Sequence, residues 1–227
     1  MNLSADLAEG AAGDEALLAH VDSASVGCGV HAGSVSVTIA TLSRCRALQV
    51  EVGAHPGYDD RANFGRADLP LTPDDIEQLV AFQVAALAAL ARVAYIKAHG
   101  ALYHRCQRDP AAADALARVA RAHGVGVIGQ PGREILAGAK RAGIPGYREG
   151  FADRLVQADG SLAPRSQPGA VLDARRAVEQ ALHLASSGLY DTICMHGDSP
   201  DAGETAAAVR SALRSAGIAT APLAGRS

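Results

Sequence analysis

The chain has 227 residues, and its 21 Lys and Arg against 24 Asp and Glu give a formal net charge of −3. A chain of this length forms one domain or two small ones and buries a core without disulfides or a structural metal. The near balance of charge provides no broad basic face, and aromatic residues, at 4%, are too few for base-stacking surfaces. We therefore expect no nucleic-acid partner and no membrane partner.

The start of the chain and its cysteines bear on where the protein works. The first ten residues contain Asp6 and Glu9 and no basic leader before an apolar run, so we expect no secretory signal. The longest apolar stretch, residues 79–91, is too short to cross a bilayer. The four cysteines are far apart and form no C-x-x-C pair, which is typical of reduced thiols. We therefore expect a cytoplasmic protein.

Short β-like runs alternate with longer helical runs along the whole chain, which predicts an α/β protein built on a parallel sheet. Seven strands are expected, with a weaker eighth: Asn2–Asp6, Ser25–Val30, Val50–Ala54, Ala94–Ala98, Val125–Ile128, Gly146–Gly150, Thr192–Met195 and Ile218–Ala221. Thr72 and Asp109, each followed by Pro, are expected to cap helix starts. Gly124, Gly143 and Gly217 are expected to close helices in the left-handed conformation.

One long polar segment, Phe151–Gly169, breaks this alternation. Its Asp159-Gly160 pair is a turn signal, so the segment is expected to form a loop or hairpin. Connections of this length more often carry function than not, although a plain surface excursion is the alternative.

Four of the eight histidines end β-like runs and have a glycine within two residues. They are His31, His55, His99 and His196. The carboxyl ends of parallel strands meet at one rim, and glycine lets the backbone turn sharply there and lets a ligand approach. A single such histidine is easily structural, but four in parallel positions predict one shared pocket. We assign no chemistry to His20, His123 and His183, which lie in or beside helical stretches.

Carboxylates and a lysine are expected at the same rim. The carboxylates are Asp6, Glu9, Asp153 and Asp198. Carboxylates next to histidines fix a tautomer, tune a general base or complete a metal site. Lys97 lies two residues before His99, and the strand period of two puts both side chains on one side. The alternative for Lys97 is a structural ion pair with Asp6 or Glu9.

The loop after the third strand carries turn residues and Arg66, a side chain suited to a carboxylate or a phosphate. The chain contains neither a G-x-x-x-x-G-K-[ST] motif nor a G-x-G-x-x-G motif after a strand. Any nucleotide contact is therefore unconventional or belongs to a partner.

Segments along almost the whole chain resemble one family, the LamB/YcsF or lactam-utilisation family. They are DLAEG at Asp6–Gly10, GCGVHAG at Gly27–Gly33, GAHPGY at Gly53–Tyr58, NFGR at Asn63–Arg66, KAHGALY at Lys97–Tyr103, FADR at Phe151–Arg154, DGSLAPR at Asp159–Arg165 and CMHGDSP at Cys194–Pro200. The resemblance implies a seven-stranded (β/α) barrel related to the glycoside hydrolase/deacetylase architecture. It also implies ATP-dependent opening of 5-oxoproline to L-glutamate together with subunits B and C of a 5-oxoprolinase.

The resemblance also implies site residues. The catalytic candidates are Asp6, Glu9, His31, His55, Lys97, His99, His196 and Asp198. The substrate-binding candidates are Tyr58, Asn63, Arg66, Tyr103, Asp153, Arg154 and Arg165. We expect Asp6 or Glu9, with His31 and His55, to activate and orient water. Lys97 and His99 are expected to stabilise a developing oxyanion or phosphate.

The remaining roles concern the leaving group, the substrate carboxylate and ATP. His196 and Asp198 are expected to protonate the departing nitrogen or hold the substrate, and Arg66 or Arg154 to pair with its carboxylate. ATP, with Mg²⁺, is the implied co-substrate, and the sequence leaves open whether this chain or its partners bind it.

The chain departs from the family's usual motifs at several positions. They are Asn2, Ala5 and Ala8, where Asp, Cys and Gly are usual, Ser34 and Val35, where Asp and Pro are usual, and Ala98, where Pro is usual. Two acidic contributions are therefore missing, while the His and Lys positions are intact.

Two other functions fit the same pattern. One is a stand-alone metal-dependent hydrolase or deacetylase that binds a divalent ion through Asp6, His31 and His55. The other is a non-catalytic subunit that binds a lactam or a sugar. Seven strand–helix units of roughly 30 residues each account for the chain, so we expect one barrel domain over residues 1–227.

Overall fold

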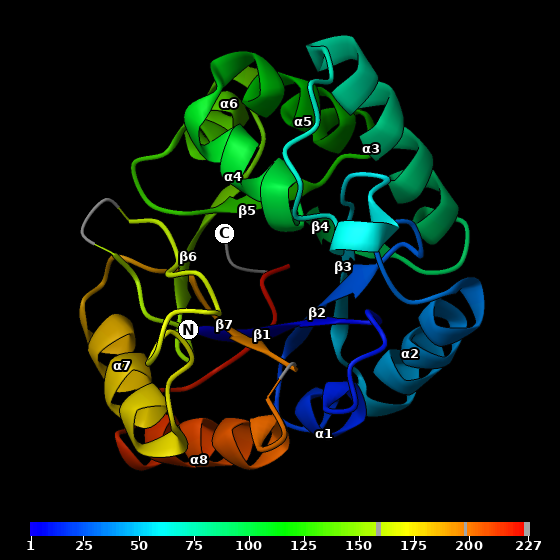
Figure 1. The fold of residues 1–227 in the computed structure, drawn as a ribbon. Coiled ribbons are helices and arrows are strands. Elements are labelled where there is room, and N and C mark those ends of the chain that lie inside the picture. The colour runs from blue at the N-terminus through cyan, green and yellow to red at the C-terminus, as the bar shows by residue number, and fades with distance from the viewer. Residues whose placement is uncertain (158–159, 198, 225–227) are drawn as a thin grey trace.

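The computed structural model describes residues 1–157, 160–197 and 199–224, and within them seven parallel strands close into a barrel (Figure 1). They are β1 (Asn2–Leu7), β2 (Ser23–Gly27), β3 (Glu51–His55), β4 (Val93–Ile96), β5 (Gly126–Gly129), β6 (Gly146–Phe151) and β7 (Thr192–His196). The strands pair in chain order, and β7 pairs with β1 to complete the ring. The expected α/β barrel is confirmed.

Helices surround the barrel on the outside (Figure 1). They are α1 (Asp14–Leu18), α2 (Val35–Leu48), α3 (Pro73–Ala88), α4 (Gly100–Arg108), α5 (Pro110–Ala122), α6 (Glu134–Ala142), α7 (Ala174–Ser186), α8 (Ala202–Ser215) and the 3₁₀ helix η1 (Arg61–Asn63). Thr72 and Asp109 cap α3 and α5 through their side chains, as predicted. Gly124, Gly143 and Gly217 have φ of 66°, 69° and 74°, which confirms the expected helix ends.

The alternation of β1 explains why the interior of the barrel is polar. Side chains alternate between the two faces of a strand. The odd positions of β1 are apolar and belong to the hydrophobic core: Leu3, Ala5 and Leu7. The even positions are polar and wholly or almost wholly buried: Asn2, Ser4 and Asp6. Asp6 pairs across the barrel with Lys97, the residue directly after β4, so the even positions face the lumen.

β2 begins two residues earlier and ends three residues earlier than predicted. Residues 28–30 were expected in this strand, but the chain turns away after Gly27. Gly29 and Gly33 have φ of 77° and 62°, and a Cβ on Gly33 would lie 2.1 Å from the carbonyl oxygen of Ala8. Only glycine fits at Gly33, and the close approach brings the loop after β2 against the loop after β1.

The eighth strand predicted at Ile218–Ala221 is wrong. β1 and β7 pair directly, with Asp6 opposite His196, so the closed ring offers no edge for another strand. Residues 218–221 contact the start of the chain, where the Ala221 N–H donates to the Met1 carbonyl oxygen at 3.0 Å.

The segment after α8 closes the barrel at the amino ends of its strands. Leu223 is fully buried against Tyr95 and Ile128. The carboxylate of Glu51, the first residue of β3, accepts hydrogen bonds from the N–H groups of Leu223 and Ala224 at 2.9 and 2.7 Å. The amino-terminal end of the lumen is therefore covered, and the carboxyl-terminal rim holds the cavity described below.

The polar segment after β6 folds back on itself. Isolated antiparallel bridges join Arg154 to Val171 and Val156 to Leu162. Asp159 of the predicted turn lies outside the described residues. In the part of the chain that is described, no helix has the length and apolar character needed to span a bilayer.

Candidate active site

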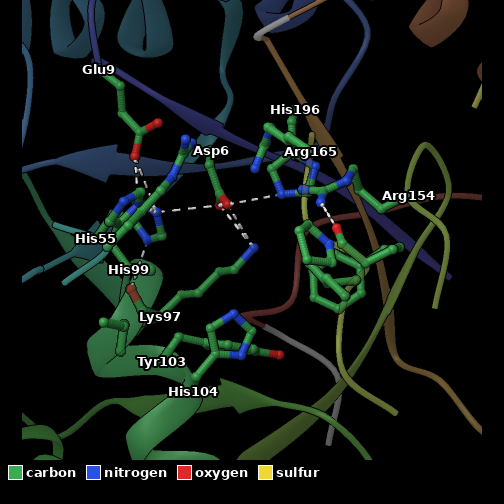
Figure 2. Close-up of a pocket in the computed structure, with 18 residues that line it drawn as sticks. Asp6, Glu9, His55, Lys97, His99, Tyr103, His104, Arg154, Arg165 and His196 are labelled. Carbon is green, nitrogen blue, oxygen red and sulfur yellow. Dashed lines mark hydrogen bonds and ion pairs between the residues drawn. The ribbon is translucent and has the colours of Figure 1, made fainter. Parts of the chain in front are cut away.

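A buried lysine lies between two carboxylates at the carboxyl-terminal rim. Lys97 Nζ is 2.8 Å from Asp6 Oδ1 and 2.6 Å from Glu149 Oε1. Tyr103 Oη donates to Glu149 Oε2 at 2.8 Å. The ion pair between Lys97 and Asp6 is confirmed, and both residues line the cavity (Figure 2).

The charges of this group are mutually stabilising. Burial alone would raise the pKa of Asp6, but the charges of His55 and Lys97 outweigh it and hold the pKa well below its usual range. Burial disfavours the Lys97 ammonium, but the Asp6 carboxylate and further neighbouring groups keep its pKa well above the usual value. Lys97 is therefore a fixed positive charge beneath the cavity, placed to stabilise an anion.

Three histidines converge on one carboxylate oxygen. Glu9 Oε1 lies 3.0 Å from His31 Nε2, 3.4 Å from His55 Nε2 and 2.8 Å from His99 Nδ1. Burial raises the pKa of Glu9, but hydrogen bonds from the three rings lower it further than burial raises it. Ala8, where the family usually has glycine, has φ of 65° and directs the backbone so that Glu9 faces the rings.

Backbone carbonyl groups fix the orientation of two of these rings. His55 Nδ1 lies 2.8 Å from the Lys97 carbonyl oxygen, and His99 Nε2 lies 2.9 Å from that of Phe64. A carbonyl oxygen only accepts, so both ring nitrogens carry protons. The second nitrogens of the two rings, His55 Nε2 and His99 Nδ1, face each other at 3.1 Å beside Glu9.

A second acid–base pair lies at the end of β7. The His196 backbone N–H donates to Asp153 Oδ2 at 2.7 Å, and His196 Nδ1 lies 3.0 Å from Asp153 Oδ1. Burial raises the pKa of Asp153, but the charge and hydrogen bonds of His196 lower it below its ordinary value. With Nδ1 held by a carboxylate, Nε2 is directed toward the cavity and lies 3.7 Å from Asp6 Oδ2. This arrangement suits proton transfer at Nε2.

These groups surround a cavity of about 380 Å³ that also contains cationic side chains. Figure 2 shows Arg154 and Arg165 on one side of Lys97 and the histidine cluster on the other. Arg66 lines the cavity and places its guanidinium 4.8 Å from the centre of the Phe64 ring. Arg154 donates to the carbonyl oxygen of Ala163 at 2.7 Å and so braces the segment after β6 that forms one wall.

Not all residues predicted for the site line this cavity. The His31 side chain is completely buried behind the cluster. Tyr58 is fully buried away from the cavity, and Asn63 donates to Asp60 in the loop around η1. Asp198 lies outside the described residues. The remaining predicted residues line the cavity, except Asp153, which acts on it through His196.

Sequence reasoning missed two residues of the site. Glu149 lies inside β6 and not at its end, so it escaped a search for strand-end carboxylates; its strand parity with Phe151 was the available signal. His104 lies on α4, one turn after Gly100, and lines the cavity. Burial and the charges of Arg108 and Arg154 lower its pKa.

Two side-chain clusters among the described residues have donor atoms close enough to share a metal ion. The set predicted from sequence, Asp6 with His31 and His55, is not one of them. In the cluster of Asp6, Cys194 and His196, Lys97 Nζ lies 3.0 and 3.1 Å from the first two groups. Burial also raises the pKa of the Cys194 thiol, so this cluster does not suit a cation. The cluster around Glu9 offers imidazole nitrogens and a carboxylate, the donors that zinc-type ions prefer.

Two departures from the usual family motifs have structural explanations. Ser34 is the N-cap of α2, and its side chain accepts a hydrogen bond from the Val37 N–H at 3.2 Å, as an Asp would. Asn2 lies at the opposite end of the lumen, where it donates to Ser23 Oγ at 2.8 Å. Neither position contributes a charge to the cavity.

The fold and the rim together define a class of protein: a closed, seven-stranded parallel (β/α) barrel with an acid–base site at the carboxyl ends of its strands. Within that class the chain belongs to the LamB/YcsF family, whose model matches residues 1–227.

Individual relatives agree with this assignment. The chain is 41% identical to a 5-oxoprolinase A subunit from Chloroflexus aurantiacus, over 90% of this chain and 89% of that protein. It resembles the crystal structure of a lactam utilization protein from Thermus thermophilus, with a TM-score of 0.88, 32% identity, and coverage of 97% of this chain and 98% of that one. A family 4 carbohydrate esterase from Streptomyces lividans, with a TM-score of 0.58 and 8% identity over 99% of this chain and 92% of that one, shares the fold.

Proposed function

We propose that this chain is the A subunit of an ATP-dependent 5-oxoprolinase, which with partner subunits B and C hydrolyses 5-oxoproline to L-glutamate. The observation that carries the proposal is the rim itself. The Lys97 ammonium lies between the Glu9 histidine cluster and the His196–Asp153 pair, in one cavity with three arginines. The 41% identity to a protein named as a 5-oxoprolinase A subunit supports the same reaction.

The cavity fits a small anionic substrate. 5-Oxoproline has one carboxylate and one five-membered lactam, and a volume of about 380 Å³ is at the small end of ligand pockets. Arg66 and Arg165 are the candidates to pair with the carboxylate, since a guanidinium matches the geometry of a carboxylate. Arg154 is held by Ala163, so its role is to keep the wall of the cavity in place.

The requirement for ATP follows from the chemistry of the lactam. An unstrained amide is a poor electrophile, and phosphorylation of its oxygen makes the carbon reactive toward water. Water adds to that carbon, the ring C–N bond breaks as the nitrogen takes a proton, and hydrolysis of the resulting acyl phosphate yields glutamate and phosphate. Because this chain has neither common phosphate-binding glycine motif, we propose that subunits B and C take part in the ATP step, with Mg²⁺ accompanying the nucleotide.

The acid–base groups of the rim have distinct roles in this scheme. His196, with Nδ1 held by Asp153, presents Nε2 to the cavity and delivers the proton to the departing nitrogen. Glu9 and its histidines orient the attacking water, and a ring of this cluster takes up its proton. Lys97 stabilises the negative charge that develops on oxygen.

Reconstitution tests the proposal. The chain alone, subunits B and C alone, and all three together are assayed for glutamate formation from 5-oxoproline, with and without ATP. We expect glutamate only from the three together with ATP. Glutamate from the chain alone without ATP would instead identify a stand-alone hydrolase. Full turnover by subunits B and C without this chain would show that the chain is not catalytic and at most binds the substrate.

A further inference from the structure

We propose that Glu9, His55 and His99 bind one divalent transition-metal ion of the zinc type, and that His31 positions Glu9 from behind. The inference goes beyond the proposed function, since that reaction assigns no ion to this chain. It rests on the geometry of the four side chains and not on the identity of the substrate.

The three donor atoms are spaced as ligands of one ion. Glu9 Oε1, His55 Nε2 and His99 Nδ1 are separated by 2.8, 3.1 and 3.4 Å. A point about 2.1 Å from all three atoms, the usual zinc–ligand distance, exists roughly 1 Å outside their plane. These distances allow the three atoms to share one ion.

The ring orientations leave His55 Nε2 and His99 Nδ1 facing each other beside Glu9. The protons of His55 Nδ1 and His99 Nε2 are donated to the backbone carbonyl groups of Lys97 and Phe64. When both rings are neutral the opposite nitrogens carry lone pairs, and a cation among them and Glu9 would be bound by these pairs; without a cation, the hydrogen bonds to Glu9 require protons on these nitrogens. Metal-binding histidines characteristically donate their other ring proton to a carbonyl or a carboxylate.

His31 has a different geometry and so a different role. Its ring is stacked on that of His99, with centroids 3.9 Å apart and planes 10° from parallel. A ring nitrogen directs its lone pair within the ring plane, so two parallel stacked rings do not aim at one point. His31 is also completely buried and does not line the cavity. Its Nε2, 3.0 Å from Glu9 Oε1, is placed to donate to the carboxylate and fix it.

The three proposed ligand residues line the cavity of the candidate active site. Glu9, His55 and His99 line the same cavity as Lys97, whereas Asp6 is already paired with the lysine. A divalent ion there would supply Lewis-acid chemistry beside the Lys97 charge.

A shared proton is the competing occupant. If the His55 or His99 ring carries two protons, an imidazolium paired with Glu9 gives the same distances between heavy atoms. Metal binding measured directly on the chain separates the two arrangements.

The test uses the full chain, stripped of metal with a chelator and dialysed against ZnCl₂ or CoCl₂ with MgCl₂ in excess. We expect one Zn²⁺ or Co²⁺ per chain. His55→Ala and His99→Ala should each lower the affinity at least about 100-fold, and His31→Gln about 10-fold to 100-fold without abolishing binding. His123→Ala, an exposed histidine at the end of α5, is the matched control and should bind as the wild type does.

The visible spectrum of the Co²⁺ form keeps the test decisive if a variant fails to fold. Ligation by imidazole and carboxylate gives weak d–d bands without a thiolate charge-transfer band, whereas binding at Cys194 would produce one. Absence of stoichiometric Zn²⁺ and Co²⁺ binding, a thiolate band, or wild-type affinity in folded His55→Ala and His99→Ala overturns the site. A loss in His31→Gln equal to that in His55→Ala overturns the positioning role. Activity enters none of these outcomes, so they are independent of the oxoprolinase proposal.

Discussion

At the scale of single residues, the site depends on charges whose partners are all within the barrel. Lys97, only 2% exposed, is compensated by Asp6 and Glu149, and Glu9 is compensated by histidine rings. A buried charge without a partner costs several kcal/mol, so each of these groups is stable only in the company of the others. The charged side chains at the rim are therefore stable only because their partners also lie in the lumen.

Cys106 gives a pH prediction outside the site. Burial raises the pKa of its thiol from 9.0 to about 12. The unfolded thiol loses its proton near 9 and the folded one does not, so stability is lost as the pH rises from about 9 toward about 12. The free energy of unfolding is measured by urea denaturation at about pH 7.5 and at about pH 10. Between these two pH values it should fall by about 1.4 kcal/mol more in the wild type than in Cys106→Ala. An equal loss in both proteins would contradict the assigned shift.

The sequence predicted individual site residues where they end strands and missed those that do not. His55, His99 and His196 come together because carboxyl strand ends share a rim, which their spacing from glycine signalled. Glu149 acts from inside a strand, where only packing decides whether a carboxylate meets a lysine. The contact of Glu9 Oε1 with three histidine rings depends on the turn at Ala8, which motif spacing does not encode.

At the scale of elements, α2 ends on a residue other than glycine. Gln49, at its C-cap, is exposed and has φ of 57°, a conformation that costs a residue with a Cβ about 1 kcal/mol or more. Gln49→Gly should therefore raise the free energy of unfolding by about 1 kcal/mol. Gln78→Gly, at an exposed position inside α3, is the matched control and should lower it by about 1 kcal/mol. Chemical denaturation measures both, and destabilisation by Gln49→Gly would refute the assigned strain.

The segment after α8 should contribute to stability although it forms no strand. Leu223 is fully buried, so Leu223→Ala should lower the free energy of unfolding by about 2–5 kcal/mol. Leu189→Ala, at a side chain 57% exposed, is the control and should change it by less than about 0.5 kcal/mol. Equal small effects at both positions would show that the covering segment adds nothing to the barrel.

The presence of each helix and strand was easier to predict from the sequence than the residues at which it begins and ends. All seven strands were predicted from β-like runs in the sequence. The helix starts at Thr72 and Asp109 were also predicted, because a capping side chain bonds to backbone groups only two or three residues away. The shift of β2 and the absence of an eighth strand were not predictable, because both depend on contacts distant in sequence. One is the approach of Gly33 to Ala8, and the other is the closure of β7 onto β1.

At the scale of the whole molecule, the two ends of the barrel have different roles. The amino ends of the strands are covered by the chain's own C-terminal segment, which anchors on Glu51. The carboxyl ends carry the charges, the histidines and the cavity. Because side chains in or directly after β1, β3, β4, β6 and β7 meet there, the site exists only when the ring is closed. The function is therefore a property of the complete barrel.

One variant tests the proposed function most directly. His196→Asn keeps a donor for Asp153 but removes the nitrogen that faces the cavity, so the fold should persist while proton delivery is lost. His183→Asn, at an exposed position of α7, is the matched control.

The decisive measurement is the rate of ATP-dependent glutamate formation from 5-oxoproline by each variant combined with subunits B and C. We predict that His196→Asn lowers kcat by about 10²-fold to 10⁴-fold at an unchanged melting temperature, while His183→Asn keeps the wild-type rate. A folded His196→Asn protein that forms glutamate at the wild-type rate would contradict the assignment of ring opening to this rim.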